Sequence, residues 1–251
     1  MPIPEIICTD IKIEEAPFRH FYARNFFRND FYELLVQEFE KVKETGLVEY
    51  IDKNKLSRFP GYDAYCWLLP PGCSYPLNIF YSYKWIDYFS ALFGVTLTAD
   101  VVAEFHHHKI NSSSGFKHND YNICCFVDDP LPNKVNPWYF QCSYDKKNND
   151  MTSGRVTGRM RTIAIIYYLN NEPWKEGDGG ETGLYANLGD AQPAVAIPPV
   201  SNAIMAFEIS PVSWHAFITN TKNERNTIIM WLHADAEKQI SRYGVKPQPF
   251  G

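Results

Sequence analysis

The sequence lacks three features that would assign it to a common class of protein. It has no apolar run of about 18–20 residues, the length that spans a bilayer, so we expect no membrane segment. Its 24 Lys and Arg residues are outnumbered by 29 Asp and Glu residues, and this net charge of −5 does not indicate a nucleic-acid-binding surface. Its six cysteines form no CxxC pair and are few for 251 residues, which argues against a disulfide scaffold.

The N-terminal residues also lack a basic stretch followed by an apolar one, which is the pattern of a secretory signal. Together with the cysteine pattern, this leads us to expect reduced thiols and a cytoplasmic protein. We therefore expect neither a membrane nor a nucleic acid among its partners, and the sequence leaves the oligomeric state open.

The order of the predicted elements indicates a mainly β fold with flanking helices. Asp30 and Glu33 have the spacing of a capping box for a first helix that ends at Gly46, and a second helix over 83–93 ends at Gly94. From residue 95 onward, β-branched and aromatic runs alternate with turns, at 95–110, 123–127, 162–169, 203–209, 215–219 and 227–232. Helices followed by many short strands are typical of a double-stranded β-helix (a cupin-like jelly roll) with N-terminal helices.

We interpret the whole chain, 1–251, as a single domain. Residues 1–94 are expected to form a mostly helical support and residues 95–235 the jelly-roll core. The stretch 128–158 is polar and rich in Pro, Asn and Lys, and a loop of this length is either disordered or functional. Its four embedded aromatic residues favour a lid that packs against the core over a disordered tether.

A metal-binding pattern lies within the strand-rich part. His118 and Asp120 form an HxD pair, and His215 follows 95 residues after Asp120. Two imidazoles and one carboxylate on one face of an ion leave positions open, as in non-haem iron oxygenases. An HxD pair alone also occurs by chance in surface turns. Here Arg225 and Thr227 follow on the next strand, where a guanidinium and a hydroxyl can hold a carboxylate.

This combination resembles the Fe(II)/2-oxoglutarate-dependent dioxygenases, and within them the prolyl-hydroxylase-like branch. The resemblance runs from about Val101 to Asp235, and Pro17-Phe18-Arg-His-Phe21 before the first helix is also similar to that branch. Its most specific stretch is Arg161-Thr-Ile-Ala-Ile-Ile-Tyr-Tyr-Leu-Asn170. Further elements follow in the same order at the right spacings: Trp174, Gly179-Gly180, His215, Arg225 and Trp231.

The resemblance implies a role for each matching residue. Three residues would bind Fe(2+) and would therefore be the catalytic residues: His118, Asp120 and His215. Three residues would bind the distal carboxylate of 2-oxoglutarate: Arg225, Tyr168 and Thr227. The implied reaction consumes 2-oxoglutarate and O2, releases succinate and CO2, and hydroxylates an unactivated C–H bond, with ascorbate as a candidate stimulant.

Two departures from the family pattern bear on the site. The family usually has a Tyr ten residues before the first metal His, and this sequence has His108 there. An imidazole can also donate a hydrogen bond, so we assign His108 to the co-substrate. The alternative is a plain strand residue, since the adjacent side chains of 106–108 cannot all face one metal. In addition, 40 residues, 121–160, separate Asp120 from the next family strand, and this insertion would cover the mouth of the site.

Two further residues are candidate substrate contacts. Arg161 begins the family-like stretch quoted above. The alternative interpretation is that Arg161 forms a surface salt bridge. Trp231 alternates with Arg225 and Thr227 and therefore points the same way, and its alternative is a place in the core.

We therefore predict a 2-oxoglutarate-dependent hydroxylase of a free amino acid or small metabolite, because a lid over the mouth would obstruct a long peptide. The first alternative is a peptidyl, prolyl-type hydroxylase. Two others are a cupin-type metalloenzyme without 2-oxoglutarate, which leaves Arg225 and Tyr168 unexplained, and a non-catalytic binding protein, which has no need of both the metal triad and Arg225. Halogenation is disfavoured because Asp120 fills the position that halogenases of this fold leave vacant.

Overall fold

Strands dominate the part of the chain that the computed structural model describes, which comprises residues 3–127, 134–138, 144–145, 150–151 and 156–247. The strands are β1 (His20–Ala23), β2 (Leu47–Val48), β3 (Leu56–Arg58), β4 (Tyr65–Leu68), β5 (Asp100–His108), β6 (Ile123–Val127), β7 (Asn136–Pro137), β8 (Tyr144–Asp145), β9 (Asp150–Met151), β10 (Val156–Tyr168), β11 (Thr182–Leu184), β12 (Val195–Ile197), β13 (Ala203–Glu208), β14 (His215–Phe217) and β15 (Arg225–Asp235). The helices in the same part are α1 (Asn29–Glu44), η1 (Leu77–Tyr81, a 3-10 helix), α2 (Tyr83–Phe93) and α3 (Ala236–Tyr243).

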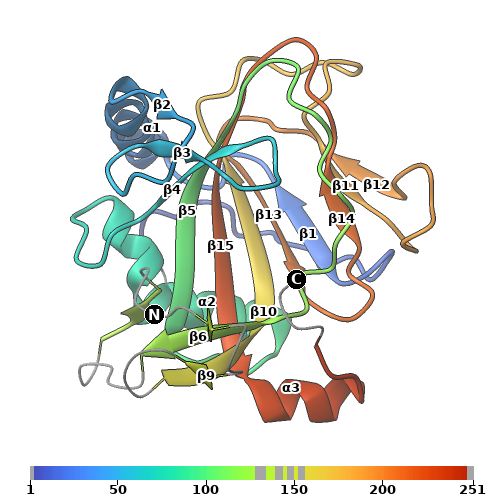
Figure 1. The fold of residues 1–251 in the computed structure, drawn as a ribbon. Coiled ribbons are helices and arrows are strands. Elements are labelled where there is room, and N and C mark those ends of the chain that lie inside the picture. The colour runs from blue at the N-terminus through green and yellow to red at the C-terminus, as the bar shows by residue number, and fades with distance from the viewer. Residues whose placement is uncertain (1–2, 128–133, 139–143, 146–149, 152–155, 248–251) are drawn as a thin grey trace.

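Two sheets form the jelly roll. The larger has ten strands in the order β1-β13-β10-β15-β5-β4-β3-β2, with β6 paired to β10 and β7 to β5. Figure 1 shows β5, β15, β10 and β13 side by side at its centre. The smaller sheet, β12-β11-β14, packs against one face of the larger, because Leu184 and Ile197 share an apolar cluster with Ile166 and Met205. We call this face of the larger sheet the inner face.

Helices α1 and α2 cover the opposite face of the larger sheet. The apolar stripe of α1 consists of Phe31, Leu35 and Phe39, which are all fully buried. These side chains share one cluster with Ile228 and Met230 of β15. Since successive side chains of a strand point to opposite faces, the residues that alternate with these two, such as Thr227 and Trp231, lie on the inner face.

The prediction of a mainly β jelly roll with helices is confirmed. Helix α2 has the predicted bounds, and Gly94 ends it in the left-handed conformation (φ 65°). The predicted capping box at the start of α1 is wrong, since the N-cap is Arg28 and the Asp30 carboxylate accepts a bond from the amide of Phe31 instead.

The first 94 residues contribute more than helices. They supply β1 through β4 to the larger sheet, and β1 pairs with β13, far away in the sequence. The sequence also did not predict β11, β12 or α3. The missed strands named here are two to four residues long, too short for a clear alternation of apolar and polar residues.

Three further expectations concern the lid, the cysteines and the membrane. Most of the predicted lid, namely 128–133, 139–143, 146–149 and 152–155 within 128–158, lies outside the described residues, so the lid stays a prediction. The five cysteines within the described part are free thiols. Among the helices of that part, none combines the length and apolar character needed to cross a membrane.

The packing of α1 on the sheet yields a stability prediction. Phe105 of β5 is fully buried, stacks on Trp67 with ring centroids 5.7 Å apart, and meets Phe39 of α1 edge-on at 5.3 Å. We expect Phe105→Ala to lower the free energy of unfolding by about 3–5 kcal/mol, because it leaves a cavity between helix and sheet. Urea denaturation measures this. Tyr50→Ala, at a residue that is 65% exposed, serves as the control and should change stability by no more than about 0.5 kcal/mol.

Candidate active site

His118 and His215 are placed opposite each other by their backbones. His215 begins β14, and His118 lies in the segment between β5 and β6. The amide of each donates to the carbonyl of the other, at 3.1 and 2.8 Å, which makes an isolated antiparallel bridge. Residues paired in this way direct their side chains to the same side, and the two imidazole centroids are 4.2 Å apart.

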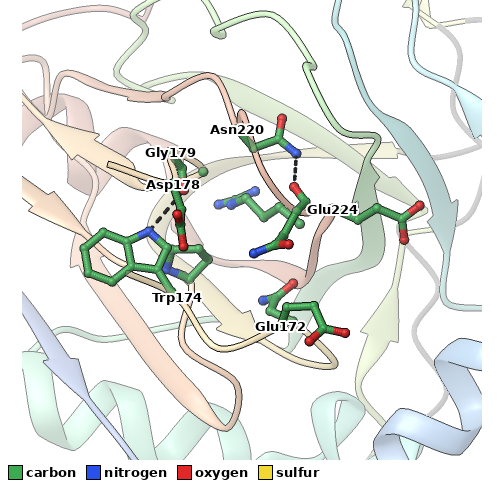
Figure 2. Close-up of a pocket in the computed structure, with 11 residues that line it drawn as sticks. Glu172, Trp174, Asp178, Gly179, Asn220 and Glu224 are labelled. Carbon is green, nitrogen blue, oxygen red and sulfur yellow. Dashed lines mark hydrogen bonds between the residues drawn. The ribbon is translucent and has the colours of Figure 1, made fainter. Parts of the chain in front are cut away.

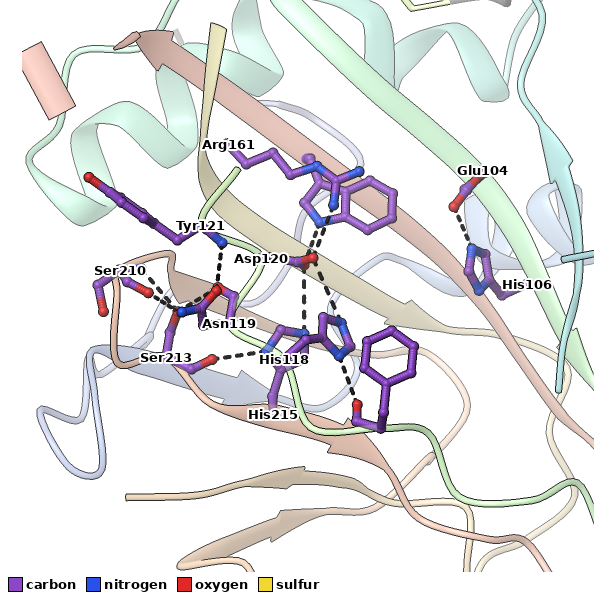
Figure 3. A network of polar contacts seen from close by, with 12 residues as sticks. Glu104, His106, His118, Asn119, Asp120, Tyr121, Arg161, Ser210, Ser213 and His215 are labelled. Atoms are coloured by element: carbon purple, nitrogen blue, oxygen red, sulfur yellow. Dashed lines mark hydrogen bonds and ion pairs between the residues drawn. The ribbon is translucent and has the colours of Figure 1, made fainter. Parts of the chain in front are cut away.

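Asp120 completes this group from a left-handed backbone position (φ 57°). The turn that holds it is built on Asn119, whose side-chain oxygen accepts from the amide of Tyr121 and whose carbonyl accepts from the Ser213 hydroxyl. The Asp120 oxygens lie 3.7 Å from Nε2 of His118 and 3.6 Å from Nε2 of His215 (Figure 3). The three donor atoms therefore converge on one point, at the spacing of ligands around a metal ion.

The imidazole orientations suit metal binding. Nδ1 of His118 is 2.9 Å from the carbonyl of Phe116, and Nδ1 of His215 is 3.0 Å from the carbonyl of Ser213. A carbonyl only accepts hydrogen bonds, so Nδ1 carries the proton in both rings and Nε2 presents its lone pair to the convergence point. This support from outside the ligand shell is typical of metal-binding histidines.

Two further side chains hold the Asp120 carboxylate. Arg161 Nη1 donates to Oδ1 at 3.0 Å, and Trp231 Nε1 donates to Oδ2 at 2.7 Å. The Arg161 guanidinium also lies over the Trp231 ring, 4.1 Å from its centroid. The sequence suggested Arg161 and Trp231 as substrate contacts, which stays a prediction, and the structure places both side chains against Asp120. The alternative for Arg161, a surface salt bridge, is wrong, because its side chain is only 14% exposed.

The protonation states of these groups follow from their surroundings. Burial opposes ionisation of Asp120, but the charge of Arg161 and the neighbouring histidines outweigh it and hold the pKa of Asp120 well below its usual range. Burial and the nearby His118 lower the pKa of His215 to about 4. At neutral pH the carboxylate is thus ionised and the His215 imidazole neutral, which are the forms that bind metals.

Arg225 is a buried cationic side chain on the same inner face. It is 2% exposed, and Nη2 donates to the Thr182 hydroxyl at 3.0 Å, which in turn is 2.8 Å from the Tyr168 hydroxyl. Among the described residues, no carboxylate forms an ion pair with Arg225, and its Nε has no hydrogen-bond partner. The nearby Thr227 hydroxyl is also buried without a partner. A buried guanidinium without an anion is costly, so this position fits an anionic ligand.

The family-like elements Trp174 and Gly179-Gly180 form a wall next to Arg225. Trp174 Nε1 donates to the carbonyl of Gly179 at 3.1 Å (Figure 2). Gly179 is required here, because a Cβ at its φ of 77° would lie 2.0 Å from the carbonyl oxygen of Thr219. The cavity that these residues line with Arg225 measures only about 10 Å³, room for about one water molecule. The ligand of Arg225 must therefore approach from the barrel interior.

His108 and Tyr62 lie on the interior side of Arg225. His108 is paired in register with Arg225, stacks on Phe217 at 4.0 Å, and has a buried Nε2 without a hydrogen-bond partner. Tyr62, from the loop between β3 and β4, meets His108 edge-on at 5.6 Å. Burial raises the pKa of Tyr62 to about 12, and the charges of Arg225 and Asp120 both act on it. Its phenol therefore lies within electrostatic reach of both groups.

Sequence reasoning did not identify Tyr62 or Thr182 as residues of this region. Tyr62 lies 53 residues before Gly115, and the absence of a side chain at Gly115 makes room for it, because a Cβ there would be 2.7 Å from the Tyr62 ring. Such a contact leaves no local pattern in a single sequence. The expectation that 106–108 cannot all face one site is confirmed, since His107 points to the other face and contacts Asn226.

These features together describe a jelly-roll protein with three converging metal-ligand side chains and a buried arginine on the same face of the larger sheet. Residues 137–233 match the model of the 2OG-Fe(II) oxygenase superfamily, a range that includes His215 and Arg225 and begins after the HxD pair. Over this stretch the chain is similar to the 2OG-Fe(II) oxygenases, that is, the 2-oxoglutarate-dependent dioxygenases. Enzymes of this superfamily use Fe(2+), 2-oxoglutarate and O2, and the three converging residues fit the iron site.

Solved structures show the same fold. A prolyl-4-hydroxylase from Pseudomonas putida is 16% identical, with a TM-score of 0.55, and the alignment covers 85% of this chain and 91% of that one. A prolyl hydroxylase from Trichoplax adhaerens, in complex with a peptide fragment of the hypoxia inducible factor oxygen degradation domain, is 14% identical, with a TM-score of 0.50 and coverage of 89% and 86%. At these identities the comparison establishes a prolyl-hydroxylase-like fold.

The bond from Trp231 to Asp120 yields a test of the metal position. Trp231→Phe keeps an aromatic ring but removes the Nε1 donor, and we expect metal affinity to fall about 10- to 100-fold, the usual effect of losing a partner of a metal ligand. Anaerobic Fe(2+) titration measures this. The control is Trp67→Phe, which removes a bond from Nε1 to the carbonyl of Lys53 and should leave metal affinity unchanged.

Proposed function

We propose that the protein binds Fe(2+) through His118, Asp120 and His215 and 2-oxoglutarate through Arg225, and that it hydroxylates an unactivated C–H bond. The observation that carries this proposal is the buried guanidinium of Arg225. It has a hydroxyl partner but no carboxylate partner among the described residues, and it shares the inner face of β15 with Trp231, which bonds Asp120. A dianionic co-substrate between Arg225 and the metal position would pair one carboxylate with the guanidinium and offer the other to the metal ion.

The side chains around this position have separable tasks in the proposed reaction. Arg225 and the Thr182 hydroxyl orient the distal carboxylate of the co-substrate, while Tyr168 holds Thr182 in place. Thr227 and His108 offer buried polar atoms without partners along the same path. When bound, the iron would supply the oxidative decarboxylation of 2-oxoglutarate that accompanies hydroxylation. The protein positions the reactants and keeps water out of the barrel.

Two substrate classes are proposed for this site. A cavity of about 490 Å³ is lined by residues 58–63, 113, 114 and 116, and the ring of Phe116 is 5.1 Å from that of His118. This volume accommodates a free amino acid or small metabolite, the class that the sequence favoured. The exposed rings of Phe59 (45%) and Phe116 (64%) equally suit an extended peptide, and the Trichoplax neighbour is a peptide complex. The peptidyl alternative therefore has at least as much support as the small-molecule one.

A substrate screen separates these two classes. Free amino acids and small metabolites form one panel, and prolyl-containing peptides form the other. Substrate-stimulated succinate formation, with mass spectrometry for one added oxygen, identifies the class that is turned over. Stimulation by peptides alone would reject the small-molecule assignment.

The proposed metal ligands yield the next prediction. Ala at His118, Asp120 or His215 should abolish substrate-coupled succinate formation, because each change removes one of only three protein ligands. Circular dichroism should show an unchanged fold. His107→Ala, at a buried imidazole on the opposite face of the larger sheet, serves as the comparison for the loss of an imidazole. Full activity in all three ligand variants would reject the iron assignment.

Arg225 yields the prediction that distinguishes a 2-oxoglutarate enzyme from a cupin-type metalloenzyme. Removing one half of a buried, hydrogen-bonded charge pair costs about 2–5 kcal/mol, so Arg225→Ala should weaken 2-oxoglutarate binding roughly 30- to 5000-fold. Arg225→Lys should be intermediate, because a point charge replaces a planar fork. Anaerobic titration in the presence of Fe(2+) measures both variants.

The matched control for this titration is Arg24→Ala, an exposed arginine outside the site. It should bind 2-oxoglutarate as the unaltered protein does, and metal affinity should remain the same in all variants. An unchanged 2-oxoglutarate affinity in Arg225→Ala would favour the cupin-type alternative.

A further inference from the structure

A second group of metal-ligating side chains lies outside the His118–Asp120–His215 site. Cys66 of β4 and Glu104 and His106 of β5 each place one donor atom within 4.8 Å of the other two. Cys66 is paired in register with His106, and Glu104 is two residues before His106 on the same strand. All three therefore lie on the inner face of the larger sheet, on adjacent strands. We call this group the Cys66 cluster.

In the Cys66 cluster His106 is buried and the other two residues are half-buried, and its polar atoms are not fully satisfied. His106 is 5% exposed, and its Nδ1 has no hydrogen-bond partner. Its Nε2 is 2.5 Å from a Glu104 oxygen. Within the described residues, this imidazole is the ion-pair partner of Glu104, and no Lys or Arg neutralises the carboxylate. A buried polar atom without a partner calls for an explanation, and an ion bound by this group of side chains supplies one.

We propose that the Cys66 cluster is a second metal site, specific for a zinc-class divalent ion. Thiolate, imidazole and carboxylate are the three ligand types of protein zinc sites, and donors around a tetrahedral zinc lie roughly 3.5 Å apart. The three donor atoms of the Cys66 cluster lie within 4.8 Å of one another, close to that spacing. The thiolate and the carboxylate together match the charge of a divalent ion, which makes the buried site neutral overall.

The two sites differ in the metal they favour. The Cys66 cluster contains a thiolate, a soft ligand that selects zinc-class ions, whereas the iron site offers only nitrogen and oxygen donors. Burial raises the pKa of the Cys66 thiol, so the ion itself must displace the thiol proton to solvent, as coordinating metals do. Figure 3 shows the Glu104–His106 pair separated from the group around Asp120. The inference does not depend on the proposed oxygenase function.

An ion at the Cys66 cluster would lie close to the proposed co-substrate path. Thr227 of β15 is paired in register with His106, and His108 follows two residues later on the same face as His106.

Cobalt is the probe that separates the two sites, because only Co2+ bound to a thiolate shows intense near-ultraviolet charge-transfer absorption. The full chain is titrated anaerobically with Co2+. We expect this absorption to appear and to saturate with one equivalent of ion, in addition to the equivalent bound by the iron site. Asp120→Ala should no longer bind the equivalent of Co2+ that belongs to the iron site, but it should keep the thiolate absorption of the Cys66 cluster.

Matched cysteine variants complete the experiment. Cys66→Ser should abolish the charge-transfer absorption, while Cys73→Ser, at another free cysteine, should keep it. His106→Ala should weaken Co2+ affinity at this site at least about tenfold, and Glu104→Gln provides a conservative variant in case His106→Ala is unstable. Absence of thiolate absorption in the unaltered protein, or its persistence in Cys66→Ser, would overturn the proposal.

Discussion

The alternation of side chains along β15 is the constraint on which the rest of the structure depends. Its even-numbered residues, among them Ile228 and Met230, pack against the helices on one face of the larger sheet. Its odd-numbered residues place Arg225, Thr227 and Trp231 on the other face, inside the barrel. A strand with a period of two can serve a hydrophobic core and a polar site at once only if its register with β5 and β10 is fixed. Pairing with both neighbours fixes that register.

Two buried charged side chains inside the barrel, Asp120 and Arg225, differ in whether the protein supplies an oppositely charged partner. Asp120 receives donors from Arg161 and Trp231 within the protein, so its carboxylate is ionised and held in one orientation. Arg225 has hydroxyl and aromatic contacts but no carboxylate partner among the described residues, so its charge stays available for a ligand. In the function that we propose, the first arrangement pre-organises a metal ligand, and the second provides binding energy for an anionic co-substrate. This difference distinguishes the site from a merely structural network of buried ion pairs.

The region is completed by segments that are far apart in the sequence. Tyr62 comes from the N-terminal third, Thr182 from the smaller sheet, and Glu104 from the strand beside β15. Tyr62 fits only because position 115 is a glycine. The N-terminal strands β3 and β4 therefore do more than support the jelly roll, since they place the loop of Tyr62 and the thiol of Cys66 at its interior.

The sequence by itself determined the class of fold, the two long helices, the central strands, and the residues His118, Asp120, His215 and Arg225, because these depend on local periodicity and on ordered motif spacing. Only the tertiary structure decided that β1–β4 join the larger sheet, that Arg161 and Trp231 bind Asp120, and that Cys66, Glu104 and His106 meet. The physical reason is that strand pairing and side-chain contacts between segments far apart in the chain depend on register and packing, which leave no periodic trace in a single sequence.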